Sequence, residues 1–381
     1  MISLCQKAHS PHQGNRSDRV SMETRRGILK LLASGALASG GSFSFSQLAA
    51  QAATVTPSSL IPYGAALYLP DLKANPKLGQ VIASYCQRVT PVAEMKWDLM
   101  RPSPTAYEFG PADAIADFAR SNRLAMHGHP LIWYASNAPW IDEIDSERAA
   151  SRLMHDHIAT VMPRYRDVVP TWDVVNEPIP DNVHRDSDRR EAWYNHIGPK
   201  AIGKAFELAH AADPNALLIL NEYDIEFAAE RSPMKLKAYR RLILELLDQG
   251  APIGGIGLQG HLRGNWPIAT EELSAFTSEM RSLGLKVLVT ELDVMDHELK
   301  GDEARRDANS LQQVRDFLTA ASAGGPLHSI TTWGISDQYT WIRWAYRRKD
   351  GASNRPLPLD WNFQEKPMMA LINEFRKSTL K

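Results

Sequence analysis

Short apolar runs alternate along this chain with longer segments in which apolar residues recur every three or four positions. The short runs predict eight strands, at residues 63–69, 88–91, 124–129, 171–176, 217–221, 256–259, 286–290 and 329–333. Helical spacing is clearest between them at residues 203–212, 233–249, 271–283 and 305–323. The pattern therefore predicts repeated strand–helix units and not a run of hairpins.

Eight such units over about 320 residues predict an α/β fold, a single (β/α)8 TIM barrel. An open, doubly wound sheet is the alternative architecture. It is disfavoured because Gly64-Ala65-Ala66, in the first predicted strand, is not a glycine-rich phosphate-binding loop. In a closed barrel, polar residues at the carboxyl ends of the strands surround one shared opening, and that is where catalytic residues are expected.

The N-terminal segment differs from the rest in charge and pattern. Residues 1–52 hold six basic and two acidic side chains, and Arg25-Arg26 precede an apolar, small-residue stretch at 31–48. We interpret 1–52 as a leader with a twin-arginine signal, whose true start is Met22 or Met1, and 53–60 as a short linker. Residues 61–381 form the expected catalytic domain.

The part after the leader carries a formal net charge of −5, since the whole chain has −1. A mildly acidic body gives no electrostatic reason to bind nucleic acid. Cys86 is the only cysteine after the leader, so no intramolecular disulfide can form. No other apolar run is long enough for a membrane span. We expect a soluble monomer in the periplasm or secreted from the cell.

Two glutamates follow predicted strands whose ends could face each other across the mouth of the barrel. Glu177 ends the fourth strand and Glu291 ends the seventh. Glycoside hydrolysis needs one carboxyl group that holds a proton and another that stays ionised. Asn176 can donate to a sugar 2-hydroxyl, and His261, oriented by Asp293, can donate to the second glutamate. The pattern therefore favours a glycoside hydrolase.

Four segments together resemble glycoside hydrolase family 10, the endo-β-1,4-xylanase family. They are residues 172–178 (WDVVNEP), 257–262 (GLQGHL), 287–293 (VLVTELD) and 332–337 (TWGISD). The resemblance extends over nearly all of the chain after the leader. It implies a (β/α)8 barrel that hydrolyses xylan through a covalent glycosyl-enzyme intermediate, with no cofactor and no metal.

The resemblance also implies roles for individual residues. Glu177 is similar to the family's acid/base and Glu291 to its nucleophile, with His261 and Asp293 orienting the nucleophile. The residues expected to contact the substrate are Lys96, His129, Trp133, Asn176, Tyr223, Gln259, Trp333 and Trp341.

The chain departs from the family pattern at four positions near the expected sugar site. Val92 and Ala93 replace a Glu-Asn pair that holds the distal glycone sugar, while Tyr134 and Ser136 replace a histidine and a glutamine. Two hypotheses follow: weaker glycone binding of ordinary xylan, or acceptance of a decorated glycan or aryl glycoside. A β-1,4-glucanase or aryl-cellobiosidase is a further alternative within the enzyme class.

Two other classes compete with a xylanase. His127-Gly128-His129 is a His-x-His motif at a strand end, and a metal-dependent hydrolase would combine it with His261, Glu291 and Asp293. A barrel that binds xylan without cutting it is suggested by the altered Val92, Ala93 and Tyr134. Binding alone does not require the retained set, and this argues against that second class: Glu177, Glu291, Asn176 and His261.

Overall fold

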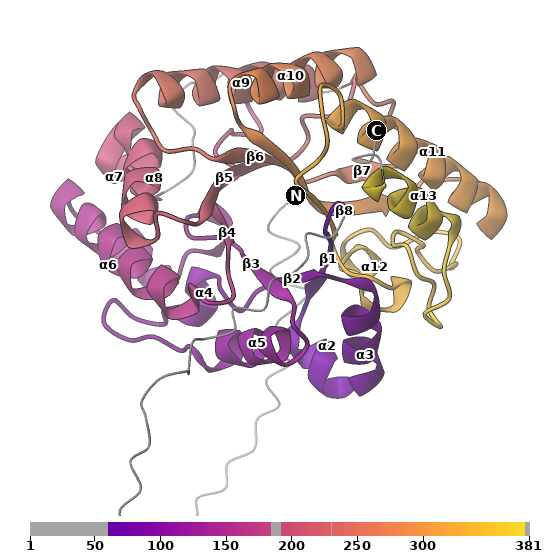
Figure 1. Ribbon diagram of the computed structural model, residues 1–381, viewed down its shortest axis with the longest axis horizontal. Helices are drawn as coiled ribbons and strands as arrows, with labels where there is room; N and C mark the ends of the chain where they lie inside the picture. Colours follow the sequence, from indigo (N-terminus) through magenta and orange to yellow (C-terminus); the bar gives the residue numbers. More distant parts are fainter. Residues whose placement is uncertain (1–59, 184–191, 230, 378–381) are drawn as a thin grey trace, which may run out of the picture.

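A computed structural model describes residues 60–183, 192–229 and 231–377, and in it the strands form a closed ring surrounded by helices (Figure 1). The hydrogen-bonded order is β6-β5-β4-β3-β2-β1-β9-β8-β7, and an additional parallel pairing of β6 with β8 closes the ring. The predicted (β/α)8 barrel is confirmed. The expected leader and most of the linker, at residues 1–59, lie outside the described residues.

Eight parallel strands make up the barrel wall. They are β1 (Tyr63–Leu67), β2 (Arg88–Pro91), β3 (Ala125–Gly128), β4 (Thr171–Asn176), β5 (Leu217–Glu222), β6 (Gly255–Leu258), β8 (Lys286–Met295) and β9 (Ser329–Thr332). Each coincides with one predicted run, with ends that differ by one or two residues in most cases. The first strand ends at Leu67, for example, because Leu69 begins a helix.

One strand is much longer than predicted. The pattern ends the seventh run at Thr290 because Glu291 and Asp293 interrupt it, but β8 continues to Met295. Its extension pairs with a short strand, β7 (His261–Arg263), which the sequence did not predict. Glu291 and Asp293 are tolerated in a buried strand because they have hydrogen-bonding partners there.

Helices lie outside the ring of strands (Figure 1). The longer ones are α3 (Pro76–Tyr85), α5 (Gly110–Ser121), α6 (Glu147–Tyr165), α8 (Ala201–Ala212), α9 (Ser232–Asp248), α10 (Thr270–Ser282), α11 (Glu303–Ala321) and α13 (Pro367–Arg376). Shorter ones are α2 (Leu69–Ala74), α4 (Trp97–Met100), α7 (Ala192–Ile197) and α12 (Ile342–Ala345). Among the described residues, no helix combines the length and apolar character needed to cross a bilayer.

Two irregularities in strand pairing lie beside the expected catalytic glutamates. The register between β4 and β5 shifts between Asp173 and Val175, and that between β8 and β9 shifts between Val289 and Leu292. Such irregularities bend a strand and re-aim its side chains. They therefore affect how Glu177, just after β4, and Glu291, within β8, face the barrel opening.

Candidate active site

Glu177 follows β4 and lies in a buried, hydrogen-bonded position at the barrel mouth. Its backbone has a φ of +57°, a left-handed conformation that is uncommon for a residue with a side chain and is frequent at functional sites. Trp133 Nε1 donates to Oε2 at 2.8 Å, and Gln259 Nε2 donates to Oε1 at 3.1 Å. Burial, followed by the charge of Glu222, raises the pKa of Glu177 to about 7. This carboxyl group can therefore hold a proton near neutral pH.

Glu291, in β8, lines the same cavity but has the opposite electrostatic environment. Burial alone would raise its pKa, but the charge of His129 and the hydrogen bond and charge of His261 outweigh burial, so the pKa is lowered. His261 Nε2 lies 3.2 Å from Oε2, and Asn221 Nδ2 donates to Oε1 at 2.9 Å. The carboxylate is therefore ionised and oriented by two partners. The two glutamates have the split pKa values that acid and nucleophile need.

His261 connects Glu291 to a second buried carboxylate. Its Nδ1 lies 2.9 Å from Asp293 Oδ1. Burial would lower the pKa of His261, but the charge and hydrogen bond of Asp293 and the contact with Glu291 hold it well above the usual range. A protonated imidazole donates from both nitrogens, which is the contact set that the sequence predicts for this pair.

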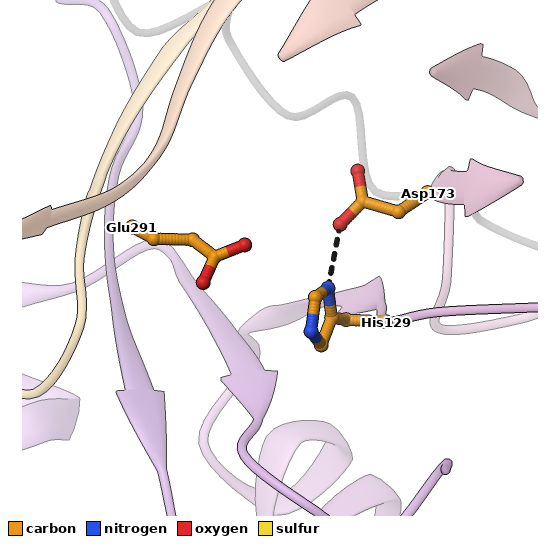
Figure 2. Close-up of side chains that lie close together, drawn as sticks. All are labelled: His129, Asp173 and Glu291. Atoms are coloured by element: carbon orange, nitrogen blue, oxygen red, sulfur yellow. Dashed lines mark hydrogen bonds and ion pairs between the residues drawn. The ribbon is translucent and has the colours of Figure 1, made fainter. Parts of the chain in front are cut away.

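His129 lies beside both Asp173 and Glu291, and one of its ring nitrogens is directed at Asp173 (Figure 2). Its Nδ1 lies 2.8 Å from Asp173 Oδ2, and His127 Nε2 lies 2.9 Å from the other oxygen of that carboxylate. Gly128 stands between the two histidines because Trp172 packs against its backbone, where an added Cβ would come within 2.1 Å of the indole. Both histidines of the His-x-His motif therefore contact the buried carboxylate of Asp173, and His129 also lines the cavity.

A metal site is the other interpretation of these residues. His129, Asp173 and Glu291 each offer an atom within 4.8 Å of the others, and they are the group among the described residues that could hold an ion. The metal hypothesis from the sequence also included His261 and Asp293 as ligands. In the structure, one nitrogen of His261 contacts Asp293 and the other contacts Glu291. Because His129 and Asp173 are already within hydrogen-bond distance, their geometry fits a shared proton better than a coordinated cation.

Aromatic and polar side chains complete the cavity around the two glutamates. Trp341 Nε1 donates to Asp293 Oδ2 at 2.8 Å, and Trp333 meets His129 edge-on, with the ring centroids 5.3 Å apart. Lys96 Nζ lies 4.5 Å from the ring centroid of Trp133. The structure brings together every residue that the sequence predicts for substrate contact: Lys96, His129, Trp133, Asn176, Tyr223, Gln259, Trp333 and Trp341 all line this cavity.

Two hydrogen bonds to the side-chain oxygen of Asn176 fix the orientation of its amide. Its Oδ1 accepts from Asn221 Nδ2 at 2.9 Å and from Gln259 Nε2 at 3.2 Å. The Nδ2 group is therefore the end available for a substrate hydroxyl. This is the donor that a sugar 2-hydroxyl requires next to the cleavage point.

The four departures from the family pattern have different positions. Val92 lines the cavity, whereas Ala93 is not among its lining residues. Tyr134 lies beside Glu177 in a small adjoining hollow, and Ser136 is buried outside both. Val92 is therefore the substitution that changes the cavity wall directly.

Four polar residues of this region had no assigned role in the sequence analysis. Asn221 contacts Glu291, and Asp173 contacts His129, as described above. Glu222 is fully buried and forms an ion pair of 2.8 Å with Lys235, a buried lysine of α9. Asp173, a charged residue between Trp172 and Val174 in a predicted strand, was a signal that could have revealed its own contact with His129. No local pattern links Glu222 to Lys235.

Comparisons with known proteins agree with this geometry. The model of glycosyl hydrolase family 10 matches residues 52–375. A β-1,4-xylanase of Dictyoglomus thermophilum is 34% identical over 306 residues, covering 77% of this chain and 83% of that protein. Endo-1,4-β-xylanase B of Paenibacillus barcinonensis is 35% identical over 319 residues, covering 80% of this chain and 92% of the relative. The crystal structure of xylanase 10B from Thermotoga petrophila with xylobiose has a TM-score of 0.72 at 28% identity and covers 85% of this chain and 96% of its own.

Proposed function

The chain belongs to glycosyl hydrolase family 10, and on that premise we propose that it is a retaining endo-1,4-β-xylanase in which Glu177 is the acid/base and Glu291 the nucleophile. The observation that carries the assignment of roles is the opposite shift of two carboxyl pKa values in one cavity. Glu177 is raised to about 7 and Glu291 is lowered. Only this pairing gives a proton donor and an ionised nucleophile at the same pH.

In the first step, a Glu291 oxygen attacks the anomeric carbon while Glu177 transfers its proton to the leaving glycosidic oxygen. The bond between the anomeric carbon and the leaving oxygen breaks, and an ester between the sugar and Glu291 forms. The contacts of Glu291 with Asn221 and His261 hold the attacking carboxylate in place. Asn176 Nδ2 donates to the 2-hydroxyl, a contact that strengthens in the transition state.

In the second step, Glu177, now ionised, takes a proton from water, and the water oxygen attacks the anomeric carbon. The ester to Glu291 breaks, and the sugar leaves with its original β configuration. Trp133 and Gln259 keep both oxygens of Glu177 hydrogen-bonded during this exchange of roles. The chemistry requires two carboxyl groups, a proton and water.

The experiment that tests this proposal compares the leaderless wild type with Glu291→Ala. Reducing-end release is measured on xylan and on carboxymethyl cellulose, and azide is added to the variant with an aryl xylobioside. The expected result is cleavage of xylan in preference to cellulose, loss of activity in the variant, and azide rescue that yields the α-glycosyl azide. Cleavage of cellulose alone would make the enzyme a β-1,4-glucanase, and rescue to a β-glycosyl azide would exchange the two roles.

We also propose that the enzyme works outside the cytoplasmic membrane. The support is the Arg25-Arg26 signal, with its apolar stretch and Ala-x-Ala site, together with a polymeric substrate that cannot enter the cell intact. Replacing both arginines by lysine should keep the uncleaved precursor in the cytoplasm. Export of that variant at the wild-type level would contradict the assignment.

A further inference from the structure

The catalytic cavity continues into a larger hollow of about 460 Å³, and the two share Val92, Trp333 and Trp341. One wall of this hollow, which we call the extended groove, comes from the segment after β1, and the other comes from residues 333–344 after β9. The family resemblance places both tryptophans on the glycone side. The extended groove is therefore where a longer xylan chain would lie beyond the cleavage point.

Arg343, in α12, lines the wall of the extended groove that follows β9. Its Nη1 donates to the carbonyl oxygen of Gln338 at 2.8 Å, which fixes the direction of the guanidinium. Within the part of the chain that the structure describes, no carboxylate lies within ion-pair distance of it. Arg348, five residues further on, differs because it contacts both Asp296 and Asp350. Arg343 is thus a positioned cation with no carboxylate partner among the described residues.

Two exposed tryptophans flank this arginine: Trp344 lines the extended groove, and Trp361 lines an adjoining hollow that Arg343 also lines. The ring centroid of Trp344 lies 4.6 Å from the Arg343 guanidinium carbon and that of Trp361 lies 5.1 Å from it. Their exposed fractions are 50% and 44%, which is high for side chains of this size. Indole rings present flat apolar faces that pack against the faces of pyranose rings, and they hold the guanidinium by cation–π contact.

We propose that Arg343, Trp344 and Trp361 form a distal subsite for a uronic-acid side chain on the xylan backbone. The guanidinium pairs with the sugar carboxylate, and the indoles contact the sugar rings. This inference rests on the proposed function, because it requires a xylan chain in the cleft. The other charged residue that lines the extended groove, Asp71, belongs to α2 on the opposite wall, so the acidic group is expected on the Arg343 side.

The inference also gives a reason for the apolar wall at Val92. A valine there cannot supply the hydrogen bonds that a polar residue gives to a glycone sugar. A charge-assisted contact further along the same groove supplies binding energy for acidic chains that neutral chains do not receive. The chain is acidic overall after its leader, so long-range attraction does not select an acidic substrate and a local cation is needed.

The test compares kcat/KM on three substrates of equal backbone length: a linear xylo-oligosaccharide, one carrying a glucuronosyl group and one carrying a neutral arabinosyl group. We expect the wild type to favour the glucuronosyl substrate. Arg343→Ala should lower the glucuronosyl-to-linear ratio about tenfold while the arabinosyl-to-linear ratio changes less than about twofold. Arg343→Lys should keep part of the preference, and about 0.5 M salt should reduce it in the wild type.

Arg305→Ala is the control, because Arg305 is an exposed arginine of α11 that lines neither the extended groove nor the hollow around Trp361. It should leave both ratios unchanged. An equal loss in Arg305→Ala, or an unaltered glucuronosyl ratio in Arg343→Ala, would overturn the subsite.

A binding measurement separates this inference from the proposed function. Calorimetry of Glu291→Ala with a glucuronosyl xylotetraose should show a Kd that rises about tenfold when Arg343→Ala is added. If the wild type cuts neither the linear nor the decorated substrates, the proposed function fails, and the calorimetry still decides whether Arg343 binds the acidic sugar. If linear xylan is cut but the Kd is the same with and without Arg343, only the subsite fails.

Discussion

Nδ2 of Asn221 lies 2.9 Å from Oε1 of Glu291, so the end of β5 holds the proposed nucleophile on β8. The same nitrogen donates to Asn176 Oδ1, also at 2.9 Å. One amide thus fixes the proposed nucleophile and the residue that precedes the proposed acid/base. Because the strands that carry these three residues are fixed in the barrel wall, the carboxylate is oriented before substrate arrives.

Asn221→Ala removes this donor, and we expect kcat on xylan to fall roughly 10- to 100-fold, the range for a hydrogen bond to a charged group. Loss of a donor to the carboxylate also raises the pKa of Glu291, so the acidic limb of the pH profile should move to higher pH. Thr290→Val is the matched control, since Thr290 Oγ1 donates to the other end of the same amide at 2.8 Å. Its effect should be smaller. A wild-type pH profile in Asn221→Ala would show that the contact does not act on the nucleophile.

The pH dependence of hydrolysis should follow the two glutamates. Glu177 must be protonated, so the rate should fall as pH rises through about 7, the value to which burial and the charge of Glu222 raise its pKa. Glu291 must be ionised, and its lowered pKa places the acidic limb below the usual range for a glutamate. Glu177→Ala should lose the alkaline limb on an aryl xylobioside with a good leaving group. Azide should then yield the β-glycosyl azide, and an unchanged alkaline limb would assign that limb to another residue.

The buried ion pair of Lys235 with Glu222 should be costly to break from one side. Lys235→Met leaves a fully buried carboxylate without its partner, so we expect a loss of about 3–5 kcal/mol of unfolding free energy, measured by urea denaturation. Lys237→Met, at an exposed lysine of the same helix, should have little effect. The double variant Glu222→Gln/Lys235→Met should recover much of the loss.

The same double variant should also move the alkaline limb of activity to lower pH. The charge of Glu222 raises the pKa of Glu177 more than the charge of Lys235 lowers it, so removing both lowers that pKa. If the alkaline limb of the pH–activity profile stays at the same pH, the charges of Glu222 and Lys235 do not set the pKa of Glu177 and burial alone does.

Restoring a polar residue at the cavity wall should strengthen glycone binding of neutral xylan. Val92→Glu adds a hydrogen-bond acceptor beside the catalytic residues, and at about 0.5–1.5 kcal/mol per hydrogen bond the KM for linear xylotetraose should fall roughly 2- to 10-fold. Val92→Ile keeps the wall apolar and should not lower KM. Ala93→Asn should change less, because Ala93 does not line the cavity. A KM that is unaltered in Val92→Glu would show that the valine is not what limits glycone binding.

The sequence by itself determined the barrel and the location of its chemistry. Runs of strand-forming residues alternate with helical spacing, and that rhythm specifies eight βα units whatever the side-chain contacts are. Glu177 and Glu291 were identifiable because each follows an apolar run, where a charged residue needs a partner or a function. The expected substrate contacts came from the resemblance to glycoside hydrolase family 10, because strand ends alone do not single out residues such as Lys96 and Trp341.

Only the tertiary structure decided which groups act on one another. Asn221 is 70 residues from Glu291 in sequence, and Lys235 belongs to a helix that follows its partner's strand, so neither contact has a local signature. The extension of β8 to Met295 was missed because charged residues interrupt the pattern, and their buried partners come from other strands. A pKa depends on burial and on charges a few ångströms away. The resemblance of the two motifs predicts which glutamate is the acid/base and which the nucleophile, but the opposite pKa shifts that support this proposal arise only in the folded cavity.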